Sequence, residues 1–172
     1  VLFRSKIIDH LIEAHGRKRI AFLRGPDGNE DSMWRERGYR EALLAHKIKI
    51  DSKLISQGNF DEEDAYLAIK SMLDKGIKLD AVFAGDDDSA IGVISALLSA
   101  GLKVPRDVAV VGFDDAPPAR FSNPPLTTIP ADIDGAGHIA AQMLIELINK
   151  GKTQSLALLP TELVIRKSCG CK

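Results

Sequence analysis

Apolar residues recur along the chain with two spacings, one typical of helices and one typical of buried strands. Helical spacing, in most cases followed by a glycine, predicts helices over residues 6–15, 31–47, 61–75, 87–100 and 132–150. Short continuous apolar runs predict strands over residues 19–24, 53–57, 80–84, 108–111 and 161–165. Apolar strands between amphipathic helices are typical of a parallel sheet buried on both faces. Since crossovers are right-handed, we predict an α/β fold with a doubly wound parallel sheet.

The segment from Pro117 to Pro130 interrupts this alternation. It contains five prolines, from which we predict that it is not helical, and we interpret it as a crossover into a second lobe. The helix over 6–15 has no strand before it, and the helix over 132–150 follows the crossover. We expect their apolar faces to pack on a first lobe whose sheet is encoded upstream.

The first five residues resemble the translated end of a common sequencing adapter and are set aside from the fold prediction. The remaining chain is expected to divide into four parts. These are a helix of an incomplete N-terminal lobe (6–17), the C-terminal lobe (18–121), the crossover with a helix of the N-terminal lobe (122–155), and a return strand with a tail (156–172).

Composition excludes several classes of protein. The 172 residues have a formal net charge of -1, whereas a DNA-binding domain is usually basic. No apolar run approaches the roughly 18 residues of a membrane span. The two cysteines of the chain fit a reducing cytoplasm, where we expect the protein. Cys169 and Cys171 are too few for a structural zinc site without histidine partners, and they are poorly placed to bridge each other. We therefore predict no metal site and no cofactor.

A glycine follows each of the first four predicted strands, at Gly25, Gly58, Gly85 and Gly112. Ligands of open α/β sheets bind outside the carboxyl ends of the strands, so these exits are the place to look for a site.

Acidic residues gather at two of these exits. Asp86, Asp87, Asp114 and Asp115 either face a shared cleft or cap the following helices, and we expect Asp87 or Asp88 to act only as a cap. Carboxylates beyond those caps can accept hydrogen bonds from ligand hydroxyls. Phe60, after the second strand, either packs on the apolar face of a sugar ring or is a core residue at the start of a loop.

The same region excludes several chemistries. Acids at the strand ends disfavour a nucleotide phosphate, and adjacent aspartates rarely all reach one metal ion. The chain has no dinucleotide or Walker A fingerprint, no nucleophile elbow and no His-Glu-x-x-His motif. Its histidines, on predicted helices away from the acidic exits, are expected to have surface or packing roles. We therefore predict that the chain is not an enzyme and has no catalytic residue.

Six short motifs, taken together and in order, resemble the lactose/galactose-repressor (LacI/GalR) family of transcription regulators. Their order and spacing agree from about Lys6 to Ser168, and this joint order makes the resemblance specific. The motifs are His15–Phe22, Arg35–Tyr39, Phe83–Asp87, Val110–Asp115, Pro124–Ile129 and Leu159–Val164.

This resemblance implies a periplasmic-binding-protein-like fold of type I with two lobes. The chain supplies mostly the C-terminal lobe plus pieces of the N-terminal lobe, and the N-terminal helix-turn-helix is missing. The implied protein is a homodimer that binds a small effector between its lobes, and this binding changes its affinity for operator DNA. DNA contacts belong to the missing domain and not to this chain.

The motif positions imply a set of effector-binding residues. These are Arg35, Phe60, Asp86 and Asp114, with Ile133 and Ala136 lining the cleft from the other lobe. Many family members have asparagine in place of Asp86, and an ionised carboxylate accepts hydrogen bonds but does not donate them. Two acids against one cation favour a neutral, hydroxyl-rich sugar over a phosphorylated ligand, with a purine as the alternative.

Two other functions stay open. The ending over residues 165–171 resembles sensor modules of signalling proteins, such as those fused to a diguanylate cyclase or a kinase, as well as repressors. An exported sugar-binding transport protein has the same fold, although the motif at Pro124–Ile129 resembles the repressor branch.

Overall fold

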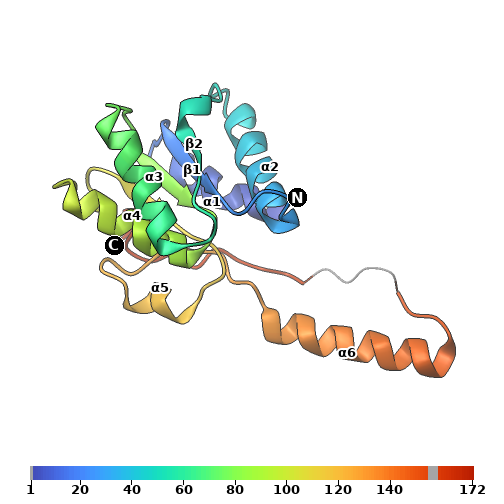
Figure 1. Cartoon of the computed structure of the whole chain (residues 1–172). Helices are drawn as coiled ribbons and strands as arrows, with labels where there is room; N and C mark the ends of the chain where they lie inside the picture. Colours follow the sequence, from blue (N-terminus) through green and yellow to red (C-terminus); the bar gives the residue numbers. More distant parts are fainter. Residues whose placement is uncertain (1, 155–158) are drawn as a thin grey trace.

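A computed structural model describes residues 2–154 and 159–172 and shows a four-stranded parallel sheet (Figure 1). The strand order is β2-β1-β3-β4, and the register pairs Phe22 with both Ile55 and Phe83. This confirms the predicted doubly wound sheet. The strands are β1 (Ile20–Arg24), β2 (Ile55–Gln57), β3 (Ala81–Ala84) and β4 (Ala109–Val111).

Helices cover both faces of the sheet. Four of them belong to its layers: α1 (Leu2–Glu13) and α2 (Glu30–Ala45) contact each other, as do α3 (Glu62–Asp74) and α4 (Asp87–Ser99). A 3-10 turn, η1 (Ser52–Leu54), leads into β2, and two further helices, α5 (Pro117–Phe121) and α6 (Ile133–Lys150), follow β4. No helix in residues 2–154 and 159–172 combines the length and apolar character needed to cross a membrane.

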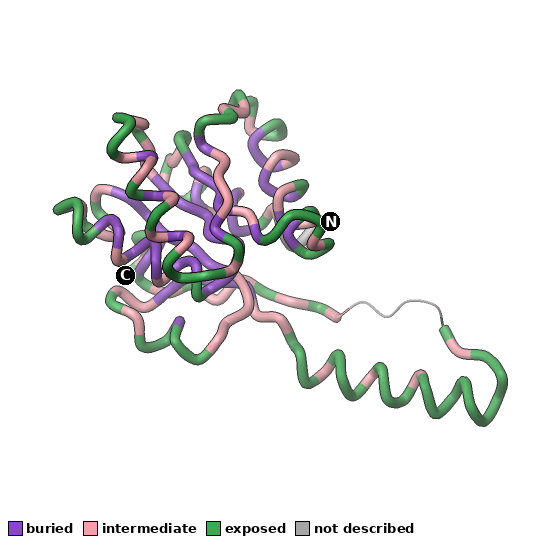
Figure 2. The backbone as a smooth tube through the Cα atoms, viewed as in Figure 1, coloured by how far each residue is buried: buried purple, intermediate pink, exposed green. Residues whose placement is uncertain are grey.

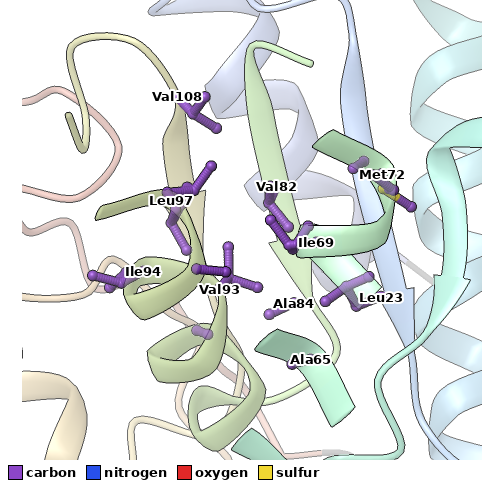
Figure 3. Close-up of a cluster of buried hydrophobic side chains, with 14 of the residues drawn as sticks. Leu23, Ala65, Ile69, Met72, Val82, Ala84, Val93, Ile94, Leu97 and Val108 are labelled. Carbon is purple, nitrogen blue, oxygen red and sulfur yellow. The ribbon is translucent and has the colours of Figure 1, made fainter. Parts of the chain in front are cut away.

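Successive strand residues point to opposite faces and build two separate cores, as the two-residue period of a strand requires. Leu23, Val82 and Val110 face α3 and α4, where they pack with Ile69 and Leu97 (Figure 3). The second core lies on the opposite face and contains Phe22, Tyr39, Phe83 and Val111, together with α1 residues. Both faces of β1, β3 and β4 are therefore buried, which explains their continuous apolar runs in the sequence, whereas the three residues of the edge strand β2 are only partly buried.

Helix α1 belongs to this sheet and not to a separate lobe. Its Ile7, Ile8 and Leu11 are fully buried in the core that contains Phe22 and Phe83. The expectation that this apolar face packs on another lobe is therefore wrong, because α2 and the sheet already cover it. The helix also begins earlier than predicted, since Leu2–Ser5, which were set aside, form its first turn.

The proline-rich segment contains a short helix that was not predicted. Pro117 and Pro118 occupy the first helical positions of α5, where a proline loses no intrahelical hydrogen bond. The prediction that prolines exclude a helix here is therefore wrong for residues 117–121, although it describes the extended segment up to Pro130. That extended segment runs alongside β4, with Gly112 N–H donating to the Thr127 carbonyl at 3.0 Å.

The predicted strand over 161–165 is also absent. Only Val164 pairs there, in an antiparallel bridge to Thr128 with two backbone hydrogen bonds of 2.9 and 3.1 Å. Arg166 then anchors the returning chain through the Asp115 carboxylate at 2.6 Å. The predicted domain boundary at residues 155–156, and the start of the return segment, lie outside the described residues.

Helix α6 extends away from the sheet as an arm (Figures 1 and 2). None of its residues is buried, and its apolar side chains include Ile133 at 74% and Ile148 at 73% exposure. Its sequence is nevertheless amphipathic, with apolar residues at helical spacing. The apolar face of this helix is uncovered by the rest of the described chain, as expected from the sequence.

Candidate functional site

Arg35 lies at the centre of the carboxyl edge of the sheet. It is carried by α2, whose N-cap Asn29 accepts from Ser32 N–H. The side chain is only 9% exposed and forms an ion pair with Asp114 at 3.1 Å. It also donates to the carbonyl oxygen of Gly85 at the end of β3. The guanidinium of Arg35 is thus held by residues that follow two neighbouring strands, β3 and β4.

Two aromatic rings pack against the same guanidinium. The central carbon of Arg35 lies 5.0 Å from the centroid of Phe60 and 4.2 Å from that of Phe113. Cation–π contacts at these distances favour one orientation of the arginine. Phe113 was not among the predicted site residues, although its position beside Asp114 after a buried strand was a signal available in the sequence.

The Phe60 ring lies directly against the backbone at two strand exits. A Cβ atom at Gly25 would be 2.2 Å from the ring, and one at Gly85 would be 2.7 Å from it. These glycines are needed because a ring fills the space beside them. Asn59 and Phe60 also have positive φ angles of 54° and 59°. Two successive left-handed residues cost conformational energy, which is common where a loop serves a binding site.

The helix cap after β3 is Asp86, and not Asp87 or Asp88 as predicted. Asp86 is the N-cap of α4 and accepts from Ser89 N–H at 3.0 Å. Asp87, which was expected to be a cap, instead accepts from Thr128 Oγ1 at 2.7 Å and from Ala116 N–H at 2.8 Å. Asp86 is the cap because it keeps an extended backbone, while α4 begins at Asp87, the residue at which the sequence predicts the helix to start. Asp87 thereby ties the crossover to the start of α4.

Asp114 occupies a strained backbone position after β4. Its φ angle is 109°, and its N–H donates to the Ile129 carbonyl at 2.7 Å. Burial raises the pKa of Asp114, and the nearby Arg35 guanidinium opposes this rise. Burial also raises the pKa of Asp86, against the hydrogen bonds from Ser89. Two partly desolvated carboxyls and one guanidinium therefore share this edge.

The structure brings together four of the six predicted site residues. Arg35 contacts Phe60 and Asp114 directly. Its positive charge also opposes the rise that burial causes in the pKa of Asp86. The other two, Ile133 and Ala136, lie exposed at the start of the α6 arm.

This arrangement suits a ligand with hydroxyl groups and an apolar face. Carboxylate oxygens accept hydrogen bonds and the guanidinium donates them, while an aromatic ring offers a flat apolar surface. Hydrogen-bond acceptors outnumber the cationic donor here, which disfavours an anionic ligand. None of the side chains named so far forms a nucleophile–base pair.

Comparison with known proteins identifies the family. The family described as "Periplasmic binding protein-like domain" matches residues 8–169. The transcriptional regulator CelR of Thermobifida fusca is 37% identical over 92% of this chain and 46% of its own length. The ribose operon repressor of Escherichia coli K12 is 35% identical over 88% of this chain and 46% of its own length. The chain thus spans about half the length of these curated relatives.

Solved structures agree with the sequence matches. A CelR–cellobiose complex superposes with a TM-score of 0.85 at 34% identity, covering 96% of this chain and 50% of that one. The lac repressor dimer bound to operator and an anti-inducer superposes with a TM-score of 0.90 at 30% identity, covering 96% and 57%. These relatives are named as regulators and not as enzymes. The chain therefore belongs to the periplasmic binding protein-like domain family, in the form found in LacI-type transcription regulators.

Proposed function

We propose that this chain is the effector-sensing part of a cytoplasmic transcription repressor of the LacI type. The observation that carries the proposal is the buried pair of Arg35 and Asp114, flanked by Phe60, at the carboxyl edge of a sheet of this family. The relatives are regulators, which favours this function over a sensor of a signalling enzyme or a transport protein. Operator DNA is contacted by a segment outside this chain, and the working protein is a homodimer.

The effector is a neutral sugar. Asp114 has one oxygen directed at Arg35 and a side chain that is 32% exposed, so it can accept from a ligand hydroxyl. Phe60 supplies the apolar face on which a sugar ring packs. The complex of the related CelR with cellobiose supports this class of ligand. Ile133 and Ala136 contribute once the α6 arm and the rest of the second lobe close over the site.

Calorimetry on the complete gene product that contains this chain tests the proposal. The panel consists of neutral mono- and disaccharides, their phosphates and purines. Asp114→Ala removes one acceptor and leaves the Arg35 cation buried without its partner. A lost buried hydrogen bond costs about 1–3 kcal/mol, so the affinity for the effector falls by roughly tenfold or more. Operator binding in the absence of the effector is unchanged.

Asp74→Ala is the matched control, because Asp74 pairs with Lys70 on the exposed surface of α3 and its side chain is 63% exposed. It should bind the effector as tightly as the wild type. If a purine or a sugar phosphate binds and no neutral sugar binds, the proposed ligand class is refuted. If the Asp114→Ala protein binds the effector with wild-type affinity, the proposed site is refuted. If no ligand of the panel changes the affinity of the gene product for operator DNA, the proposed function is refuted.

A further inference from the structure

Two histidines and two cysteines meet where helix α1 ends. His10 Nε2 lies 3.4 Å from Cys169 Sγ and 3.7 Å from Cys171 Sγ. His15 Nε2 lies 3.4 Å from Cys171 Sγ. One ligand atom from each of the four residues lies within 4.8 Å of every other. The sequence offered no histidine partners for the cysteines, whereas the fold supplies two across separations of 156 to 161 positions.

The backbone around this cluster is held in place from both sides. On α1, the neighbouring Leu11 is fully buried in the core, which fixes the helix turn that carries His10. On the tail, Ser168 bonds to β4 twice: its carbonyl accepts from Val110 N–H at 2.9 Å, and its hydroxyl donates to the Val110 carbonyl at 2.6 Å. Gly170 then turns the tail with a φ of 114°. The cluster is therefore preorganised by contacts that do not depend on the four side chains.

Three of the six separations among the four ligand atoms match those of a tetrahedral metal site, and all six lie within 4.8 Å. Zinc–sulfur bonds of about 2.3 Å and zinc–nitrogen bonds of about 2.0–2.1 Å put tetrahedral ligand atoms about 3.3–3.8 Å apart. The three nitrogen–sulfur distances, 3.4, 3.4 and 3.7 Å, lie in this range. Two thiolates with two imidazoles are a ligand set of closed structural zinc sites. The four residues include no carboxylate, which disfavours magnesium and calcium.

We propose that His10, His15, Cys169 and Cys171 together bind one Zn²⁺ ion. The two thiols release their protons on binding, and the imidazoles bind as neutral rings. Such a site joins the first helix to the C-terminal tail and so closes nearly the whole chain into a loop. Zinc binds the folded chain and stabilises it by linkage.

This site is separate from the effector site. His15 comes before β1 begins, whereas Arg35 comes after β1 ends. The returning chain runs antiparallel to the crossover, from Val164 beside Thr128 to Ser168 beside Pro125, and so heads toward the amino edge of the sheet. The proposed ion is therefore located at the opposite end of the strands from the Arg35–Asp114 pair. Its role is structural and does not depend on the function proposed above.

Metal binding by the purified 172-residue chain tests the proposal. The reduced, chelator-treated chain is titrated with Zn²⁺ against a chromophoric chelator and, separately, with Co²⁺. We expect one Zn²⁺ per chain, intense visible bands of tetrahedral cobalt with thiolate ligands, and a Tm that rises with Zn²⁺. Cys171→Ser and His15→Gln each remove a half-buried ligand, and each should weaken Zn²⁺ binding by on the order of a hundredfold.

His138→Gln is the matched control, because His138 lies exposed on the α6 arm. It should bind Zn²⁺ like the wild type, and circular dichroism should show that all three variants fold. Zinc binding that is equally strong in Cys171→Ser and in the wild type would overturn the proposal. So would a wild-type chain that binds no Zn²⁺, or one in which Cys169 and Cys171 form a disulfide while Zn²⁺ is present.

Discussion

Gly92 lies in α4 where this helix packs against the first turn of α3, and it leaves no room for a side chain. A Cβ atom there would be 2.0 Å from the carbonyl oxygen of Glu62 and 2.9 Å from its carbonyl carbon. Both are backbone atoms, so no side-chain rotation relieves the clash. Gly92→Ala therefore forces α3 and α4 apart by about 1 Å, across the core that contains Ile69 and Leu97.

The size of the effect follows from two opposing contributions. Replacing glycine by alanine within a helix stabilises it by about 1 kcal/mol. Overpacking typically costs 1–3 kcal/mol, and a clash with backbone belongs near the upper end of about 3 kcal/mol. The net loss is about 2 kcal/mol in the free energy of unfolding. At about 2–4 °C per kcal/mol for a chain of this size, Tm falls by roughly 4–8 °C.

Urea unfolding followed by circular dichroism measures this loss. Gly137→Ala is the matched control, because Gly137 is also helical and a Cβ there would meet no atom within 4 Å. It should leave the chain as stable as the wild type or slightly more stable. The packing argument is refuted if Gly92→Ala unfolds at the same urea concentration as the wild type, or if both substitutions destabilise equally.

Three further predictions concern pH, α1 and the α6 arm. Burial raises the pKa of Asp87 to about 7, so the folded chain keeps a proton that the unfolded chain releases, and the free energy of unfolding falls as pH rises from about 4 to 7. The free energy of unfolding falls by at most about 4 kcal/mol over this range. Urea titrations of Asp87→Asn should show a flatter dependence of stability on pH. A wild type that gains stability from about pH 4 to 7 would contradict the assignment. Ile8→Ala should cost about 2–5 kcal/mol in the same urea assay, because the side chain is fully buried, and a loss below about 1 kcal/mol would mean that α1 does not pack here in solution. The exposed Ile145 and Ile148 should drive concentration-dependent association in light scattering, which Ile145→Glu with Ile148→Glu should reduce; a monodisperse wild-type monomer would contradict this.

The layers of the fold were predictable because the burial of a segment determines the residue types of that same segment. A strand such as Ala81–Ala84, covered on both faces, is a continuous apolar run whatever covers it. The residue types of an amphipathic helix, in contrast, do not indicate the surface against which it packs. The pattern in α1 showed that Ile7, Ile8 and Leu11 are buried, but it contained no information on which surface buries them. The sheet of this same chain does so, and the prediction of a separate lobe failed for that reason.

The candidate site was predictable only in part. Arg35 and Asp114 were chosen from motifs, and their ion pair joins residues 79 positions apart. Their role in effector binding remains a prediction. Asp86 and not Asp87 caps α4, because the helix begins at Asp87, as predicted, and a cap is the residue just before the first helical one. The histidine–cysteine cluster was missed because its halves lie at the two ends of the chain, where no local spacing connects them.

The chain passes beside β4 twice, and the hydrogen bonds between these two passes have a mechanical consequence. The outgoing segment at Thr128 and the returning segment at Val164 are bonded to each other, and Thr161 Oγ1 donates to the Pro130 carbonyl at 2.7 Å. Helix α6 is therefore attached to the rest of the described chain through this two-stranded neck. Torsional changes in a few neighbouring residues reorient the whole arm, while the hydrogen bonds of the four-stranded sheet stay intact. A rotation at this neck is consequently far less costly than any rearrangement within the layers.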